Sequence, residues 1–291
     1  MARPALSGSR ALQVIDVMAG APDRAFTLSD LVRATESNFA SCHAVISILV
    51  ARGYLLRDDA TKTYRLGPAL FAAGQAMAKH DPLLSALRSA SDALTERTGL
   101  SISVSARAGD ELVGVSRHGQ NRLLAQGIRV GQRVPLKPPI GATVLAWSCD
   151  EDIDNYIARG GIALDAPEAA QLRDELAAIR RRGYLATLNT DSYAAISKAM
   201  AQRYAEEDRK ARAGQLISGL YGGLFQPETI EPAGSYDLAF IGAPIFDRRG
   251  YPLYSVVLSG FGGRISGAAI EDYAAQLTRM CTDVMRSGAA T

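Results

Sequence analysis

The chain has 291 residues, of which 47% are hydrophobic and 21% charged, with a formal net charge of +2 at pH 7. This length suits two ordinary domains, and no apolar run reaches the roughly 18 residues that a membrane span requires. The N-terminal segment also lacks the apolar stretch of a signal peptide. We therefore expect a cytoplasmic protein that does not enter a membrane.

Three cysteines, Cys42, Cys149 and Cys281, are too few and too far apart to predict a disulfide framework or a zinc site. We expect no metal and no cofactor. Residues 1–80 hold nine Lys or Arg against six Asp or Glu. This excess favours a polyanionic partner, although it is smaller than the basic stripe of most nucleic-acid binders.

The first 67 residues predict three short helices and a hairpin. Apolar spacing predicts a helix over residues 9–19, and Thr27 caps a second helix that runs to about residue 35. A third helix begins after Ser37 or Asn38 and ends at Gly53. We expect its buried side to consist of Phe39, Cys42, Val45, Ile46 and Leu49. Residues 54–57 and 63–66 then predict two strands joined by a turn.

This order is typical of a winged helix-turn-helix. The outer side of the third helix carries small residues, so the helix is slim enough to enter the major groove of DNA. The alternative is a generic three-helix bundle whose outer side is merely solvated. Short hydroxyl and amide groups and nearby cations are the candidates for DNA contact: Thr27, Arg33, Ser37, Asn38, Ser41, His43, Ser47, Lys62 and Arg65.

The rest of the chain predicts a linker helix and a larger domain. The linker helix runs from Gly67 to His80, and Asp81 caps the next helix. Strands and helices then alternate irregularly, which favours a mixed α/β ligand-sensing domain over a doubly wound parallel fold. The predicted strands are 100–105, 111–115, 238–246 and 251–258, and the predicted helices are 141–147, 150–159, 167–182 and 268–286. We expect an α+β protein divided into residues 1–67, 68–81 and 82–291.

Several segments, taken in this order, resemble the IclR family of bacterial transcriptional regulators over nearly the whole chain. The most specific are YRLG at 64–67, IRRRGY at 179–184 and GAPIFDRRGYPLYSVVLSG at 242–260. The resemblance implies a regulator, not an enzyme, that binds a partly palindromic operator as a homodimer or a dimer of dimers. It also implies a GAF-like C-terminal domain that binds a small effector.

The resemblance maps the effector-binding residues of the family onto Leu123, Gln126, Val134, Pro139, Ile140, Gly141, Gly242, Pro244, Val257 and Ser259. Such a pocket is mainly apolar with a few hydrogen-bond donors. On resemblance alone, we expect an aromatic or other small organic acid as effector. Arg107, Arg122 and Arg129 are possible anion partners, although arginines at strand ends are more often solvated.

Three segments depart from the family pattern. Ala44 stands where the recognition helix commonly carries an arginine, and residues 137–143 are one residue shorter than usual and lack a lysine after the glycine. Residues 190–236 exceed the usual connection. This insertion is either a lid, in which Tyr221 or Phe225 closes over the pocket, an added subunit contact, or a disordered loop.

Two other functions compete with a DNA-binding regulator. One is an enzyme with a GAF-like domain, and the other is a protein-interaction module with a helical N-terminal part. Against the enzyme, the sequence has no G-x-S-x-G motif, no P-loop and no metal-ligand spacing. Cys149 and Cys281 have no histidine nearby in sequence, and His118 stands alone.

Overall fold

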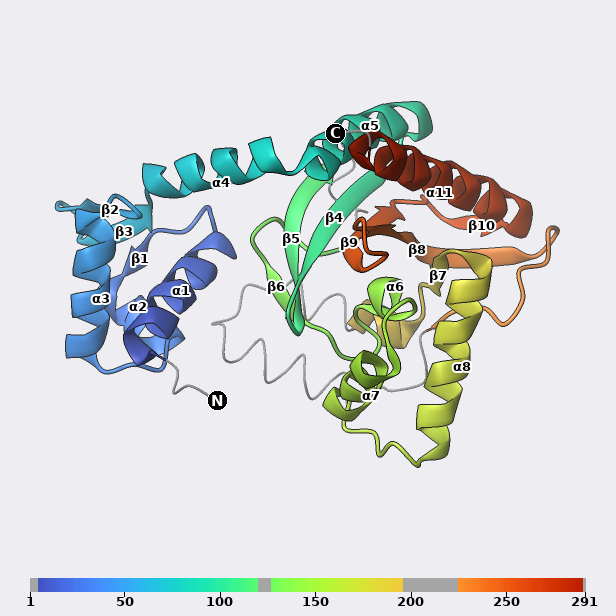
Figure 1. Ribbon diagram of the computed structural model, residues 1–291, viewed down its shortest axis with the longest axis horizontal. Coiled ribbons are helices and arrows are strands. Elements are labelled where there is room, and N and C mark those ends of the chain that lie inside the picture. Colours follow the sequence, from blue (N-terminus) through green and yellow to red (C-terminus); the bar gives the residue numbers. More distant parts are fainter. Residues whose placement is uncertain (1–4, 120–126, 196–224, 290–291) are drawn as a thin grey trace.

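The computed structural model describes residues 5–119, 127–195 and 225–289. It consists of a small N-terminal part and a larger part built on a sheet, and helix α4 (Pro68–His80) joins them (Figure 1). Within these ranges no helix has both the length and the apolar character needed to cross a bilayer. The predicted class, with helices and sheet mixed in one chain, is confirmed.

The N-terminal part is a winged helix-turn-helix. Its elements are α1 (Leu6–Ala19), β1 (Phe26–Thr27), α2 (Leu28–Ala34), α3 (Phe39–Ala51), β2 (Leu55–Asp58) and β3 (Thr63–Leu66). The strands pair in the antiparallel order β1-β3-β2, so that β2 and β3 form the wing. The helices pack around a core that includes Met18, Leu31, Ile46 and Leu55.

Side-chain caps fix where α2 and α3 begin. The Asp30 backbone N–H donates to Thr27 Oγ1 at 3.2 Å, and the Thr27 backbone N–H donates to Asp30 Oδ2 at 3.0 Å. Burial acts to raise the pKa of Asp30, but the hydrogen bonds from Thr27 and the charge of Arg24 hold it below its ordinary value. At the start of α3, the Ser41 backbone N–H donates to Asn38 Oδ1 at 2.8 Å.

Removal of the α2 cap should destabilise the small part. We expect Thr27→Ala to lower its free energy of unfolding by about 1 kcal/mol, because the Asp30 amide loses its acceptor. Thr27→Ser keeps the acceptor and should unfold like the unaltered chain. Urea unfolding followed by circular dichroism measures the difference. Equal stability of the Ala and Ser variants would contradict this assignment of the cap.

The predicted buried side of α3 is wrong at one residue. Cys42, Val45, Ile46 and Leu49 are buried, but Phe39 is 56% exposed. Phe39 is the first residue of α3, so its ring projects past the end of the core that the later turns cover. Helical periodicity fixes which side a residue lies on, not where along the helix the core stops.

The larger part is a sheet with helices on both faces. Its elements are α5 (Pro82–Thr98), β4 (Ser101–Ala108), β5 (Glu111–His118), β6 (Arg133–Pro135), α6 (Ala142–Leu145), α7 (Asp150–Arg159), α8 (Pro167–Arg182), β7 (Leu185–Leu188), β8 (Ser235–Phe246), β9 (Pro252–Ser259), β10 (Arg264–Ser266) and α11 (Gly267–Ala289). The strand order is β10-β8-β9-β4-β5-β6, with β7 also paired to β8, and these named strands pair antiparallel.

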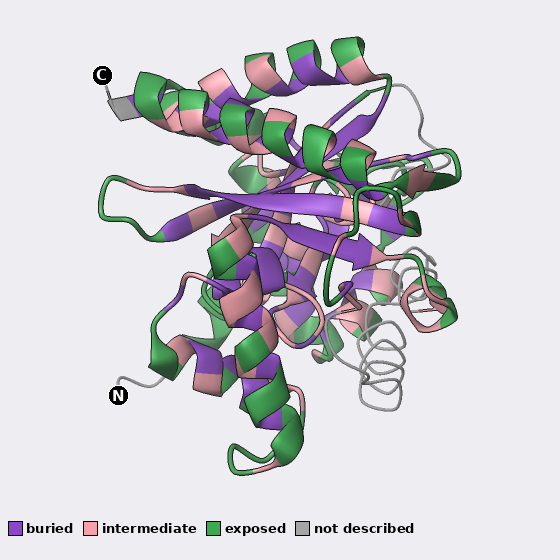
Figure 2. Ribbon diagram, turned by 90° about the vertical axis from the view of Figure 1, so that its right-hand side faces the viewer, coloured by how far each residue is buried: buried purple, intermediate pink, exposed green. Residues whose placement is uncertain are grey.

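Two apolar layers enclose the sheet. Helices α5 and α11 cover one face, where Ile102, Val104, Ile241, Val256 and Leu258 form the centre of the core. Figure 2 shows these two helices above the sheet, with buried residues on the sides that face it. Helices α6, α7 and α8 lie on the other side and have an apolar cluster of their own (Figure 1).

The two parts also touch away from α4. Asp16 of α1 forms an ion pair with Arg133 of β6, with 3.1 Å between Asp16 Oδ2 and Arg133 Nε. Gly131 (φ +77°) approaches the end of α1 so closely that a Cβ there would lie 2.2 Å from the Ala19 carbonyl oxygen. A side chain at position 131 would therefore push the two parts apart. We call this contact the α1–β6 contact.

Candidate functional site

The outer side of α3 presents several of the predicted DNA-contacting residues. Asn38, His43 and Ser47 are exposed, while Ser37 and Ser41 are half-buried. Some of their polar atoms are already engaged within the domain. Ser47 Oγ donates to the His43 carbonyl at 2.8 Å, and Asn38 Oδ1 caps the helix.

The predicted cations lie outside α3. Arg33 is on α2, Lys62 is in the turn of the wing and Arg65 is on β3, and all three side chains are exposed. Helix α3 itself, FASCHAVISILVA, has no Lys, Arg, Asp or Glu. Thr27 is exposed at the start of α2, where its hydroxyl donates to Asp30 Oδ2 at 2.8 Å. The domain thus carries these cations on elements other than the uncharged helix α3.

The central strands of the large sheet have one face that carries serines and small residues, whereas the opposite face of the sheet is apolar. In β4, β9 and β8, Ser103, Val257 and Gly242 lie directly opposite one another. Because side chains alternate along a strand, the residues two positions away share this face. The resulting three rows are Ser101, Ser259 and Phe240; Ser103, Val257 and Gly242; and Ser105, Ser255 and Pro244. We call these nine residues the serine face.

The serine face contrasts with the apolar face below α5 and α11. Its five serines are all buried, although a buried hydroxyl is unfavourable unless it forms a hydrogen bond. A sheet face that only packs against helices carries apolar residues, as the opposite face of this sheet does. Because a ligand site combines an apolar lining with a few placed polar groups, this face is the candidate ligand site.

Other segments close over the serine face. A Cβ on Gly127 would lie 2.1 Å from Ser103 Oγ, and one on Gly242 would lie 2.8 Å from Thr143 Oγ1 of α6. The ring of Tyr193 lies 5.7 Å, between centroids, from that of Phe240. Burial raises the pKa of Tyr193 above its ordinary value. The face therefore has an aromatic wall beside its hydroxyl groups.

The structure brings together only some of the residues predicted to bind an effector. Gly242, Pro244, Val257 and Ser259 all lie on the serine face. Pro139, Ile140 and Gly141 form the turn that leads into α6, whereas Val134 is buried in the apolar cluster next to α6, α7 and α8. Leu123 and Gln126 lie outside the described residues.

The sequence reasoning missed Ser103, Ser105, Thr143 and Tyr193 as candidates. The serines that alternate along β4 were a visible signal, but alternation alone does not distinguish a ligand site from a solvated strand face. Thr143 and Tyr193 join the site only through long-range packing.

The expectation for Arg107 is wrong. Its side chain is 5% exposed, with 2.9 Å between its Nη2 and Asp152 Oδ1, and its Nη1 donates to Ser148 Oγ at 2.9 Å. It is therefore neither solvated nor available to an effector anion, because α7 supplies its partner. Arg122 lies outside the described residues, and Arg129 donates from Nε to Gln132 Oε1 at 3.4 Å.

The sequence led us to expect that His118 stands alone, but the structure gives it two partners. Its Nδ1 lies 2.6 Å from Asp92 Oδ1, and its Nε2 lies 2.9 Å from Ser116 Oγ. Asp92 is on α5, so the contact ties this helix to β5. The histidine is satisfied by structural partners.

The ends of the 190–236 insertion lie beside the serine face. Residues 190–195 and 225–236 are described, and the ring of Phe225 lies 6.3 Å from that of Tyr193, which in turn contacts Phe240. The predicted closing residue Tyr221 lies outside the described residues. Phe225 thus extends the aromatic wall.

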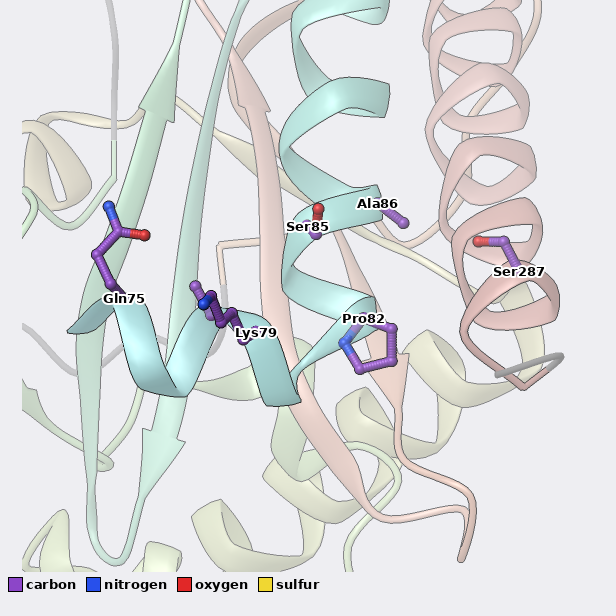
Figure 3. A pocket seen from close by; sticks show the side chains of 7 residues that line it. Gln75, Lys79, Pro82, Ser85, Ala86 and Ser287 are labelled. Carbon is purple, nitrogen blue, oxygen red and sulfur yellow. The ribbon is translucent and has the colours of Figure 1, made fainter. Parts of the chain in front are cut away.

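A separate hollow of about 590 Å³ lies where α4 meets α5 and the end of α11 (Figure 3). Gln75 and Lys79 of α4, Pro82 and Ser85 of α5 and Ser287 of α11 line it. Because α5 and α11 cover the opposite side of the sheet from the serine face, this hollow is not part of that site. Among the described residues, no cluster of three or more His, Cys, Asp or Glu is arranged to hold a metal ion.

Known proteins share parts of this sequence and this fold. Residues 75–213 match the family model described as the bacterial transcriptional regulator IclR C-terminal domain. No protein with a curated description matches the chain. An IclR transcriptional regulator from Alicyclobacillus acidocaldarius has a similar structure, with a TM-score of 0.70 and 15% identity over 98% of this chain and 100% of that one.

Two further solved structures are similar. One is HmgR from Pseudomonas aeruginosa, with a TM-score of 0.60 and 17% identity over 97% of this chain and 98% of that one. The other is an IclR homologue from Microbacterium hydrocarbonoxydans in complex with 4-hydroxybenzoate, with a TM-score of 0.64 and 18% identity over 98% and 100%. At these identities, the likeness establishes the fold.

Proposed function

We propose that this chain, whose residues 75–213 match the model of the IclR C-terminal domain, is an IclR-type transcriptional regulator that binds operator DNA and responds to a small organic acid. The winged helix-turn-helix is the DNA-binding element, and the serine face binds the acid. One observation carries this proposal. The N-terminal part has a helix, α3, whose outer side is exposed and uncharged, and the larger part has a buried face of hydroxyl groups.

The proposal extends to organisation. Residues 1–67 form the DNA-binding domain, residues 68–81 the linker and residues 82–291 the effector-binding domain, in a cytoplasmic protein. IclR regulators are not enzymes, so the remaining alternative is a protein-interaction module. The ion pair of Arg107 with Asp152 and the contact of His118 with Asp92 also give these side chains structural partners.

Salt-titrated gel shifts separate the regulator from the interaction module. The probe is the DNA upstream of the chain's own gene. We expect a shift whose affinity falls steeply with salt, because phosphate contacts by Arg33, Lys62 and Arg65 release counterions. Absence of a shift on any duplex at low salt would favour the protein-interaction module.

The serine face also supports the effector class. Phe240, Tyr193 and Phe225 offer rings against which an aromatic acid can stack, and Ser103 and Ser259 offer hydroxyl groups to its polar end. A thermal-shift screen tests this choice, since a ligand that binds only the folded state raises the melting temperature. We expect 4-hydroxybenzoate or benzoate to give a larger shift than pyruvate. The reverse order would reject an aromatic effector.

Assembly as a homodimer, or a dimer of dimers, is part of the proposal. Large apolar side chains are exposed on α1 and α4, and they are Leu6, Leu12, Phe71 and Met77. Phe71 is the most exposed of these, at 71%. A helix that leaves such residues in water has a face suited to a second copy.

Charge on that face should dissociate the assembly. We expect Phe71→Glu to lower the mass measured by size-exclusion chromatography with light scattering, because a carboxylate would be buried between two copies. Leu164→Glu, at an exposed site after α7, is the matched control and should leave the mass unchanged. An unaltered mass for Phe71→Glu would exclude α4 from the interface.

The α1–β6 contact offers a route by which the effector changes DNA binding. It lies a few residues after Gly127, which packs on the serine face, and it ends on α1 of the DNA-binding domain. An effector that moves this segment would therefore displace α1. Linkage requires that DNA then change effector affinity by the same factor.

Loss of the Asp16–Arg133 ion pair should weaken this coupling. We expect Arg133→Gln to reduce the effector-induced change in DNA affinity from about tenfold, a typical coupling, towards none. Arg173→Gln removes an ion pair with Asp154 inside the effector domain and is the control. DNA affinity is measured by fluorescence anisotropy with and without the acid found in the screen. Equal coupling in all three proteins would contradict this route.

A further inference from the structure

The exposed side of α3 is apolar to a degree that its proposed role in DNA binding does not require. Phe39 is 56% exposed, and Ala40 and Ala44 are exposed within the first two turns of the helix. A solvated phenylalanine ring gains free energy when a partner covers it, because apolar area is then removed from water. The question is which group in the major groove the ring would cover.

Charge excludes the commonest base contacts. Guanine is read best by the paired donors of arginine or by lysine, and cytosine by a carboxylate. Helix α3 carries none of these groups. Asn38 is the residue type that reads adenine, but its Oδ1 accepts the Ser41 amide at 2.8 Å, so the paired contact to adenine is not open to it.

The groove presents one apolar group, the 5-methyl group of thymine, and phenylalanine and alanine side chains pack against it. In a helix-turn-helix, the N-terminal residues of the recognition helix are those that meet base edges. Phe39 is the first residue of α3 and lies at the edge of its exposed side, and Ala40 and Ala44 are exposed within the first two turns. Position and chemistry therefore agree.

The cations complete the division of roles. Arg33, Lys62 and Arg65 are exposed on α2 and the wing, outside α3. Where such groups bind phosphates, they supply affinity without reading sequence. Sequence selection is thus left to α3.

We propose that α3 selects its operator half-site through thymine methyl groups, with Phe39 as the principal contact and Ala40 and Ala44 beside it. This inference rests on the proposed DNA-binding function. It predicts half-sites in which thymines lie under the first turns of α3, on either strand of A·T pairs.

The test uses the unaltered full chain first. Duplexes bound from a random-sequence library define the half-site, and each thymine is then replaced by uracil, which lacks only the methyl group. We expect affinity to fall about fourfold for each contacted methyl group, with no change in the salt dependence. Only the thymines under α3 should show the effect.

Variants then assign the contact. Phe39→Ala should lose most of the preference for thymine over uracil at the thymine under the start of α3, whereas Tyr251→Ala, which removes an exposed ring from the effector domain, should keep the preference there. Salt-sensitive binding with equal affinity for thymine and uracil would overturn the thymine contact but leave DNA binding intact. Absence of binding to any duplex would overturn the proposed function itself. A change in oligomeric mass for Phe39→Ala, with the thymine preference kept, would assign the ring to a protein interface and overturn the proposal.

Discussion

Replacement of Ala44 by glutamate is expected to lower affinity for operator DNA about 100-fold or more, because like charges placed against each other in an interface cost several kcal/mol. Ala44 is exposed on α3, and this helix has no cation to neutralise a new carboxylate. In the major groove, that carboxylate would lie between two rows of phosphates. Fluorescence anisotropy with a labelled operator duplex measures the loss.

Two further variants make this result specific to α3. Ala93→Glu places the same charge on an exposed residue of α5 and should leave DNA affinity unchanged. Ala44→Lys should bind DNA more tightly and with a steeper dependence on salt, since it adds a phosphate contact. Circular dichroism checks that the helices are retained. Full binding by Ala44→Glu would mean that α3 does not enter the groove.

The winged helix-turn-helix was predictable because its signals are local. Thr27 and Asn38 cap the helices that they were expected to begin, and the turn at residues 59–62 joins the two strands of the wing. Gly53 has φ +72° just after α3, a backbone conformation that favours glycine. Each of these features depends on residues within one or two turns of chain. Helix α8 likewise begins at Pro167 and ends at Arg182, as its periodicity and Gly183 indicate.

The sheet was only partly predictable. The hairpin of β8 and β9 follows from alternation across a glycine turn, but β6, β7 and β10 are strands of three or four residues with no pattern of their own. They exist because β5 or β8 offers a free edge to pair with, which is a long-range condition. The same limit explains Arg107, whose partner Asp152 is supplied by α7.

The candidate effector site shows this limit most directly. Serines alternate along β4, and Val257 and Ser259 are readable from the resemblance. Their common face emerges only when β4, β9 and β8 are placed in register, so that Ser103 meets Val257. Tyr193 lies far from these strands in sequence, and its contact with Phe240 depends on how the 190–236 insertion begins.

Filling the centre of the serine face should abolish the response to the effector. We expect Val257→Trp to lower affinity for the acid found in the thermal-shift screen about 100-fold. Val257 is the middle residue of the middle row, next to Ser103 and Gly242. An indole there would occupy the space that a ring-sized ligand needs. The ligand could enter only if the indole moved, and that movement would strain the close packing around the sheet. Isothermal titration calorimetry measures the loss.

Two readouts distinguish a blocked site from a damaged fold. Val257→Trp should still bind operator DNA as the unaltered chain does without effector, because α3 and the wing lie in the other part of the molecule. Val257→Ala removes two methyl groups but leaves the space open, so it should lose only about 15-fold in affinity for the acid, at about 0.8 kcal/mol for each group. If Val257→Trp binds the acid as well as the unaltered chain does, the effector occupies a different site and the serine face must be assigned another role.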